Sequence, residues 1–120
     1  MVRKLQIDYN EEEDILWLHG GKQVKDSLEL DDFVINFAGS EVVGLEIMNA
    51  SEVLTRYIQE KSKPAIKKML EHIVSANLRT QVKDDMIFIV AYILFEKADK
   101  MPTPVPVAVN LPRQVILAHA

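Results

Sequence analysis

The chain contains no cysteine, and this absence excludes several kinds of site at once. Disulfide frameworks, thiolate zinc sites, iron–sulfur clusters and cysteine nucleophiles all need a thiol, so none of them applies here. Glycine and proline are also scarce, with four and five residues among 120, whereas 48% of the residues are hydrophobic and 27% are charged. This composition is typical of an ordinary globular protein rather than a disordered or fibrous one.

Long hydrophobic runs are lacking as well. The longest uninterrupted run is MIFIVAYILF, Met86–Phe95, which is about half of the ~20 residues that a membrane-spanning helix requires. The opening residues, MVRKLQIDYN, hold no apolar core of signal-peptide length. We therefore expect no membrane segment and a soluble, cytoplasmic protein.

An excess of basic charge is the third absence. The formal net charge is -4 at pH 7, which disfavours attraction to nucleic acid or anionic lipid, because both are bound through an excess of Lys and Arg. A basic protein is the more natural charged partner. A length of 120 residues is near the commonest size for one domain, so we expect a single domain over residues 1–120.

Residues 1–50 carry the alternation of apolar and polar residues that is typical of half-buried strands. LQIDY and ILWLH are predicted to be two strands, joined by the acidic turn NEEED at residues 10–14. SLELDDFVINF predicts a third strand, in which Asp31 and Asp32 shift the apolar phase by one residue, so we expect a bulge or tight bend there. EVVGLEIM would complete a four-stranded antiparallel β-meander.

Three motifs in this part of the chain resemble a known family. DYNEEEDILWLHGG, FVINFAG and VVGLEIMNAS are similar to motifs of the small prokaryotic family called domain of unknown function 2283. The resemblance covers roughly residues 5–54 and departs at residues 36–38, where the family more often has an acidic-aromatic-acidic stretch. The resemblance implies a β-rich fold. It does not indicate any particular activity, because the family is uncharacterised. The positions that carry it are Asp8, Tyr9, Asp14, Leu16, Gly44, Glu46, Ala50 and Ser51.

Residues 51–77 are predicted to form the central helical segment. Ser51 is a suitable N-cap, Glu52 complements the helix dipole, and apolar pairs then recur every four residues. Because such a repeat drifts around a straight helix, Pro64 is expected to break or kink it, so that both parts face one core. Asn77 would cap the C-terminus.

Residues 78–111 are predicted to return to antiparallel strands, which makes the fold class α+β. LRTQVK and MIFIVAYILF would be joined by a tight reversal at Asp84 and Asp85. MIFIVAYILF is rich in β-branched and aromatic residues and is expected to be the longest, central strand. The prolines of PTPVPVAVN occupy alternate positions and would remove backbone donors from one side only, which predicts a Pro-blocked edge strand.

Both faces of MIFIVAYILF are apolar, and a helix covers only one of them. The second cover would be the N-terminal meander, a second copy of the chain, or both. Exposure of the whole strand is excluded, because burying one Ile or Phe side chain is worth about 1.5–3 kcal/mol. Trp17 fits a core position better than an exposed anchor, but either face of its strand is a possible interface. The interface candidates are Trp17, Ile87, Ile89, Ala91, Ile93 and Phe95.

No catalytic motif is recognisable in the sequence. Residues 19–21, HGG, lack the third glycine of an esterase oxyanion motif, and the chain has no G-x-S-x-G elbow. Residues 8–14 have the acidic spacing of an EF-hand loop, but Glu13 stands where glycine is required. The lysines of residues 61–68 fit a solvated helix face better than a phosphate-binding surface.

Three classes of function remain open, of which a non-enzymatic interaction module is favoured. Such a module would act as a homo-oligomer or as the acidic partner of a basic protein. The second class is a metal or small-ligand binder that uses the carboxylates of residues 10–14 with Asp31 and Asp32. The third is an enzyme whose site is assembled from scattered residues such as Asp8, His19 and Glu46. No cofactor and no catalytic residue is assigned.

Overall fold

The structure, a computed structural model, describes residues 2–39, 41–59, 62–84, 86–96 and 101–110. Within these ranges the chain is dominated by antiparallel sheet and has two short helices, so the predicted sheet-rich α+β class is confirmed. The elements are β1 (Val2–Asn10), β2 (Ile15–His19), β3 (Asp26–Leu30), β4 (Phe33–Ala38), β5 (Glu41–Ile47), α1 (Ala50–Leu54), α2 (Lys63–Leu70), β6 (Ile73–Lys83), β7 (Met86–Phe95) and β8 (Thr103–Asn110).

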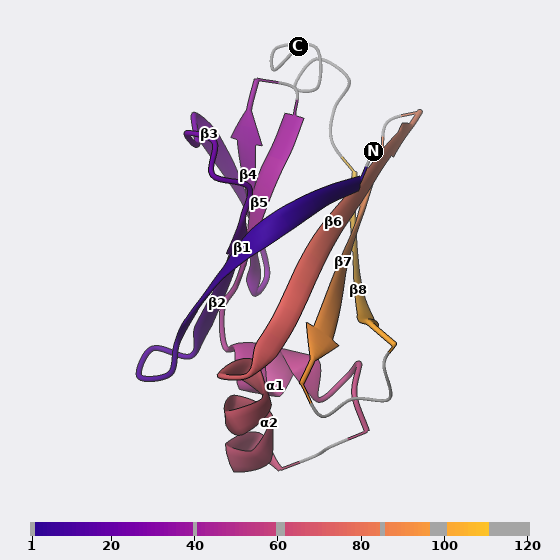
Figure 1. The fold of residues 1–120 in the computed structure, drawn as a ribbon. Coiled ribbons are helices and arrows are strands. Elements are labelled where there is room, and N and C mark those ends of the chain that lie inside the picture. The colour runs from indigo at the N-terminus through magenta and orange to yellow at the C-terminus, as the bar shows by residue number, and fades with distance from the viewer. Residues whose placement is uncertain (1, 40, 60–61, 85, 97–100, 111–120) are drawn as a thin grey trace.

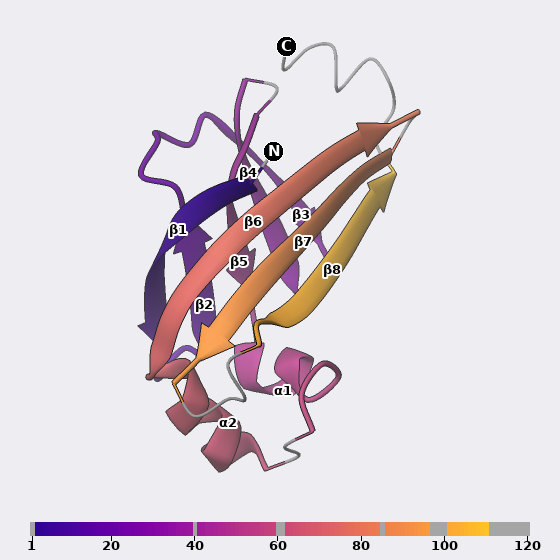
Figure 2. The ribbon, with the colours of Figure 1, turned by 45° about the vertical axis from the view of Figure 1, so that its right-hand side comes forward.

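The eight strands of the described residues form one sheet in the order β3-β4-β5-β2-β1-β6-β7-β8. β1 joins two parts of it, because it pairs with β2 on one side and with β6 on the other. The sheet is strongly twisted and bends at β1, so that β6, β7 and β8 lie across from β3, β4 and β5 (Figures 1 and 2). We call β1–β5 the N-terminal half and β6–β8 the C-terminal half.

The core fills the space between the two halves. Leu18 and Leu45 of the N-terminal half and Ile93 of the C-terminal half are fully buried in one hydrophobic cluster. Leu54 of α1 and Leu70 of α2 belong to the same cluster, so the two helices close one end of this space (Figure 1). Because side chains alternate along a strand, each strand has one face in this core and one outward face.

The region predicted as one bent strand, SLELDDFVINF, is a hairpin of β3 and β4. Asp31 and Asp32 make its two-residue turn, and Asp31 has a φ of 52°, the left-handed geometry that such turns need. The phase shift at this pair is therefore present, but its cause is a reversal of the chain instead of a bulge. A register shift occurs further on, between Asn36 and Phe37.

The predicted four-stranded meander is wrong in its strand order. β2 pairs with β1 and β5, whereas β4 lies between β3 and β5. The connection at residues 20–25 carries the chain past two strand positions before β3 begins. Alternation of apolar residues specifies which face of a strand is buried but not which strand lies beside it, so the order could not be read from this pattern.

The helical segment is shorter than predicted. α1 ends at Leu54 and α2 begins at Lys63 with Pro64 in its first turn, so the predicted break at this proline is confirmed. The N-cap of α1 is Asn49, with a φ of 50°, and Ser51 lies inside the helix, so the predicted Ser51 cap is wrong. Neither helix in the described ranges is long and apolar enough to cross a membrane.

Residues 73–77 are strand, and the prediction that they are helical is wrong. They begin β6, which pairs with β7 along most of its length and with β1 over Ala76 to Arg79. Asn77, the predicted helix cap, lies in register between Lys4 of β1 and Tyr92 of β7. β7 pairs with the segment from Ile73 and β1 from Ala76, so hydrogen bonding to neighbouring strands outweighs the local helical pattern.

MIFIVAYILF is a strand over its whole length, as predicted. It is not the longest, because β6 has 11 residues and β7 has 10, and it is not central, because only β8 lies beyond it. On β8, Val105 and Val107 are buried. Asp85, half of the predicted reversal before β7, lies outside the described residues.

Candidate functional site

The five interface candidates on β7 point into the core of the single chain. Each is at most 3% exposed, and they share the inner face of the sheet with the buried residues of β6 and β8. Any surface of β7 that a partner could reach lies on the opposite side of the strand. The five residues are Ile87, Ile89, Ala91, Ile93 and Phe95.

The opposite side of β7 belongs to an apolar outer face. Phe88, the third residue of the strand, is 40% exposed, and the other β7 side chains on this side are half-buried. Exposed residues of β8 lie in register beside them. β7 and β8 contribute no charged side chain here, and the nearest charges in register are Arg79 and Lys83 on β6. The apolar outer face comprises Met86, Phe88, Val90, Tyr92, Leu94, Pro104, Pro106 and Ala108.

Trp17 lies on the outward face of the N-terminal half. Leu16 and Leu18, its neighbours along β2, are fully buried, whereas Trp17 and His19 are half-buried. The two rings stack with their centroids 4.2 Å apart and an interplanar angle of 28°. The expected core position of Trp17 is therefore wrong, and its indole is on a face that is open to partners.

A buried amide holds the Trp17 ring in place. The indole N–H donates to Oδ1 of Asn36 over 3.0 Å, and the Asn36 amide nitrogen donates to Oε2 of Glu46 over 3.0 Å and to Oγ of Ser27 over 3.3 Å. Asn36 is only 2% exposed. The Asn36 oxygen and both of its amide protons have hydrogen-bond partners. Burying this polar side chain therefore leaves no donor or acceptor unpaired.

Gly44 makes room for this network. A Cβ atom at this position would lie 2.8 Å from Oδ1 of Asn36 and 3.0 Å from the carbonyl oxygen of Leu18. Contacts this short are repulsive, so any side chain would displace Asn36 or the neighbouring strand. The glycine of the VVGLEIM motif therefore allows the Asn36 side chain and the neighbouring strand to lie close to the β5 backbone.

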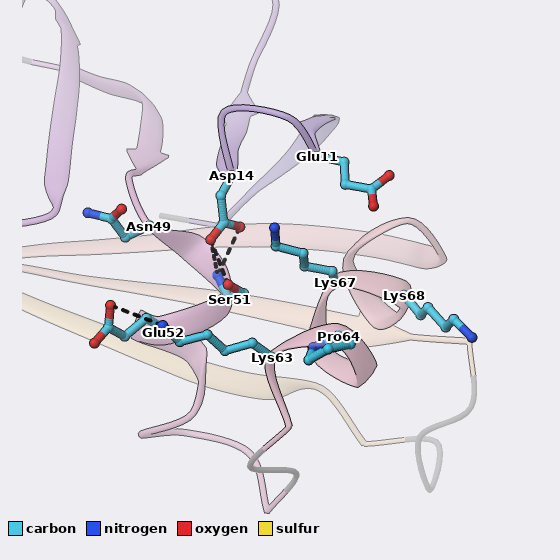
Figure 3. A pocket seen from close by; sticks show the side chains of 9 residues that line it. All are labelled: Glu11, Asp14, Asn49, Ser51, Glu52, Lys63, Pro64, Lys67 and Lys68. Carbon is cyan, nitrogen blue, oxygen red and sulfur yellow. Dashed lines mark hydrogen bonds and ion pairs between the residues drawn. The ribbon is translucent and has the colours of Figure 1, made fainter.

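A second network joins the β1–β2 turn to α1. Asp14 accepts hydrogen bonds from the hydroxyl of Tyr9 over 2.8 Å, from the hydroxyl of Ser51 over 2.6 Å and from the backbone N–H of Ser51 over 3.1 Å (Figure 3). Burial alone would raise the pKa of the Asp14 carboxyl, but the hydrogen bonds from Ser51 and Tyr9 outweigh it and hold the pKa below its ordinary value. Burial, together with the hydrogen bond to Asp14, raises the pKa of Tyr9.

A cavity of about 400 Å³ opens beside this network, between the acidic turn, α1 and α2. Lys67 of α2 extends toward Asp14 (Figure 3). Nζ of Lys63 lies 3.7 Å from Oε2 of Glu52. The hydrogen bond between Glu11 and Glu71, and the repulsion between the two, raise the pKa of Glu11. Three lysines and three acidic residues line the cavity, so its charges balance and do not select a ligand of one sign. The lining comprises Glu11, Asp14, Asn49, Ser51, Glu52, Lys63, Pro64, Lys67 and Lys68.

The two acidic turns do not form a metal centre in the described part of the chain, because no three His, Asp or Glu side chains there are placed to hold an ion. Asp14 is occupied by Ser51 and Tyr9, and Asp32 accepts a hydrogen bond from the amide of Asn49 over 3.1 Å. The carboxylates therefore act as acceptors that fasten the turns to the β5–α1 connection.

The scattered residues suggested for an enzyme do come together on one face. Asp8 and Glu46 flank Trp17 in register across β1, β2 and β5, and His19 lies on the same outward side. None of these three residues lines the cavity at Asp14. Sequence reasoning missed the role of Asn36, since no local pattern indicates that its side chain reaches Trp17. It assigned Lys67 to a solvated helix face, whereas the Lys67 side chain extends toward Asp14 (Figure 3).

These features define a small, sheet-dominated α+β protein whose N-terminal half is tied together by two polar networks. Residues 6–51 match the family described as "Protein of unknown function (DUF2283)", which confirms the resemblance seen in the motifs. Both networks are built on residues of this matched segment, whereas β6, β7 and β8 lie beyond it.

A curated protein is also similar to part of this chain. The chain is 44% identical over 52 residues to "Uncharacterized protein MJ0789" of Methanocaldococcus jannaschii, a match that covers 42% of this chain and 45% of the relative. The match thus spans less than half of either protein. No solved structure matches the chain.

Proposed function

We propose that this protein is a non-enzymatic interaction module that pairs with a second copy of itself through the apolar outer face. The observation that carries the proposal is Phe88, the third residue of the ten-residue strand β7, which is 40% exposed and has apolar neighbours on the same side. Soluble proteins expose single apolar residues freely, but a contiguous apolar patch marks a contact surface. A single domain over residues 1–120 and a cytoplasmic location are retained as part of this proposal.

A second copy is the occupant that fits the charges of this face. In a two-fold dimer each residue meets the same patch on its partner, so like charges would repel each other. β7 and β8 bring no charged side chain to the face, and the cations of β6 lie along one border. The face is therefore able to meet its own copy without electrostatic cost.

The size of the face supports a reversible dimer. The two strands of the face, of ten and eight residues, span roughly 10 Å by 30 Å, so two apposed faces bury about 600 Å² in total. Stable specific interfaces bury about 1,200–2,000 Å², so this contact lies below that range, among the weak and transient contacts. We expect association at micromolar concentrations that is lost on dilution.

Light scattering coupled to size-exclusion chromatography tests the proposal directly. At about 100 µM we expect twice the chain mass of 13.7 kDa, and the single mass after dilution. Phe88→Glu places a charge at the most exposed β7 residue of the face and should give the single mass at all concentrations. Val82→Glu is the matched control, because Val82 is 55% exposed on β6 but lies in register with the inward residue Ile87.

Two results would overturn self-association through this face. One is a wild-type protein with the single-chain mass at every concentration up to several hundred micromolar. The other is a dimer that Phe88→Glu leaves intact while Val82→Glu dissociates it, because the contact surface would then lie elsewhere on the sheet.

We further propose that β8 protects the free edge of the sheet with its prolines. Support comes from the position of β8 at the end of the strand order and from its alternation of buried Val105 and Val107 with exposed Pro104 and Pro106. Proline has no backbone N–H, so a second sheet finds fewer donors along this edge. Association would then be directed to the face of the sheet instead of its edge.

A further inference from the structure

The outward face of the N-terminal half presents a rigid aromatic surface. Trp17 and His19 stack on each other there, and the indole N–H donates a hydrogen bond to Oδ1 of Asn36. Asn36 is itself fixed by Glu46 and Ser27, so the ring orientation is determined by buried hydrogen bonds. A surface held in one geometry loses little conformational entropy when a partner binds. We call Trp17, His19, Asp8 and Glu46 the ring platform.

Two carboxylates flank the rings. Asp8 on β1 and Glu46 on β5 are the cross-strand neighbours of Trp17 on its two sides, which places their Cα atoms about 4.5–5.5 Å from that of Trp17. No ion pair within the described residues involves either carboxylate. Both therefore retain charge that a partner can neutralise.

The distribution of charge along the chain strengthens the argument. Residues 1–50 carry eleven Asp or Glu and four Lys or Arg, whereas residues 51–120 carry seven and ten. The net charge is thus -7 in the first part and +3 in the second, which together give the -4 of the whole chain. The ring platform lies wholly in the acidic part, where a cation is attracted at long range.

We propose that the ring platform binds arginine side chains of a basic protein segment. A guanidinium group is planar, so it stacks on an indole or imidazole face and at the same time donates paired hydrogen bonds to a carboxylate beside that ring. The ring platform offers both partners in adjacent positions across three strands. Nucleic acid is disfavoured because its phosphates meet Asp8 and Glu46.

Trp17 is the sole tryptophan, so its fluorescence reports this surface directly. The probe is a short synthetic peptide in which arginine alternates with serine, titrated into the full-length chain at low salt. We expect a saturable change of emission that weakens as salt is raised. The same peptide with citrulline in place of arginine keeps the planar group without its charge and should leave the emission unchanged. A lysine version should bind several-fold more weakly.

Conservative variants locate the contact. Asp8→Asn and Glu46→Gln each remove one charge while retaining an oxygen acceptor. Each should lower the affinity for the arginine peptide by roughly 3- to 10-fold. Glu96→Gln removes the same charge at an exposed position after β7 and serves as the matched control with unchanged affinity. Circular dichroism of each variant verifies that the fold is retained.

Several outcomes overturn the proposal. The first is a Trp17 emission that the arginine peptide leaves unchanged up to millimolar concentration. The second is a citrulline peptide that binds as tightly as the arginine peptide. The third is a Glu96→Gln variant whose affinity for the arginine peptide falls as much as that of Asp8→Asn or Glu46→Gln. Trp17 emission that changes on dilution of the protein alone would mean that a second copy covers the ring platform instead. Self-association through the apolar outer face concerns the other half of the sheet, so it is unaffected by any of these results.

Discussion

The carboxylate of Asp14 lies 2.6 Å from the hydroxyl of Ser51, 37 positions further along the chain. The backbone strengthens this connection, because the N–H of Ala50 donates to the carbonyl oxygen of Asp14 over 2.9 Å. The turn between β1 and β2 is thereby fastened to the first residues of α1. The acidic turn therefore stabilises the fold, and Asp14 is the residue through which it does so.

Removing one hydrogen bond at a time should measure the strength of this connection. Ser51→Ala and Tyr9→Phe each delete a donor to Asp14, and each should lower the free energy of unfolding by about 1–2 kcal/mol, since a bond to a charged group is worth more than a neutral one. Urea titration followed by circular dichroism measures the change. Glu12→Ala, in the same turn but exposed, is the control and should stay within about 0.5 kcal/mol of wild type.

The lowered pKa of Asp14 predicts a loss of stability in acid. A carboxyl whose pKa is lower in the folded than in the unfolded state stabilises the fold above its ordinary value of 3.8, and this contribution disappears as the pH falls through the folded pKa. Asn at position 14 tolerates its left-handed φ of 56° but does not titrate. The stability difference between wild type and Asp14→Asn should be constant at neutral pH and shrink below about pH 4. A difference independent of pH down to acid unfolding would contradict the assignment.

Gly44→Ala should destabilise the N-terminal half. The new Cβ meets Oδ1 of Asn36 and the Leu18 carbonyl oxygen, and overpacking of this kind costs about 1–3 kcal/mol. Since Asn36 anchors the indole, the emission of Trp17 should change as well. In the double variant with Asn36→Ala one of the two close contacts is gone, so the combined loss should be smaller than the sum of the single losses. A strictly additive result would mean that Asn36 is not what the new methyl group meets.

Restoring a backbone donor to the edge of β8 should promote aggregation. Pro106→Thr returns an N–H to the strand and gives it a good β-former, so fibrillar or amorphous aggregates should appear faster on shaking at 37 °C. Ala108→Thr adds the same side chain two residues on without adding a donor, and it should behave as wild type. Equal aggregation of the two variants would show that the β-propensity of the edge side chains, not the missing N–H, controls association at the edge.

Sequence reasoning succeeded where the controlling forces are local. Two-residue alternation correctly placed β1, β2 and β5, and the β-branched and aromatic residues of MIFIVAYILF correctly placed β7. Pro64 correctly marked the break between the helices. Sequence reasoning failed at Ile73, where a four-residue apolar repeat predicts helix but β7 supplies a strand partner at Ile73 and β1 a second one from Ala76 onward. It also failed at Trp17, because alternation divides a strand into two faces without saying which side of the sheet the core occupies.

By itself the sequence determined that this chain is rich in strands, that the acidic runs at residues 11–14 and 31–32 form turns and that no thiol chemistry is available, since these follow from residue type and short-range periodicity. The tertiary structure alone decided the strand order, the inward side of β7 and the contacts of Asp14 and Asn36. The reason is physical: each of these depends on which distant segment satisfies a backbone or side-chain hydrogen bond, and many pairings are compatible with the same local pattern.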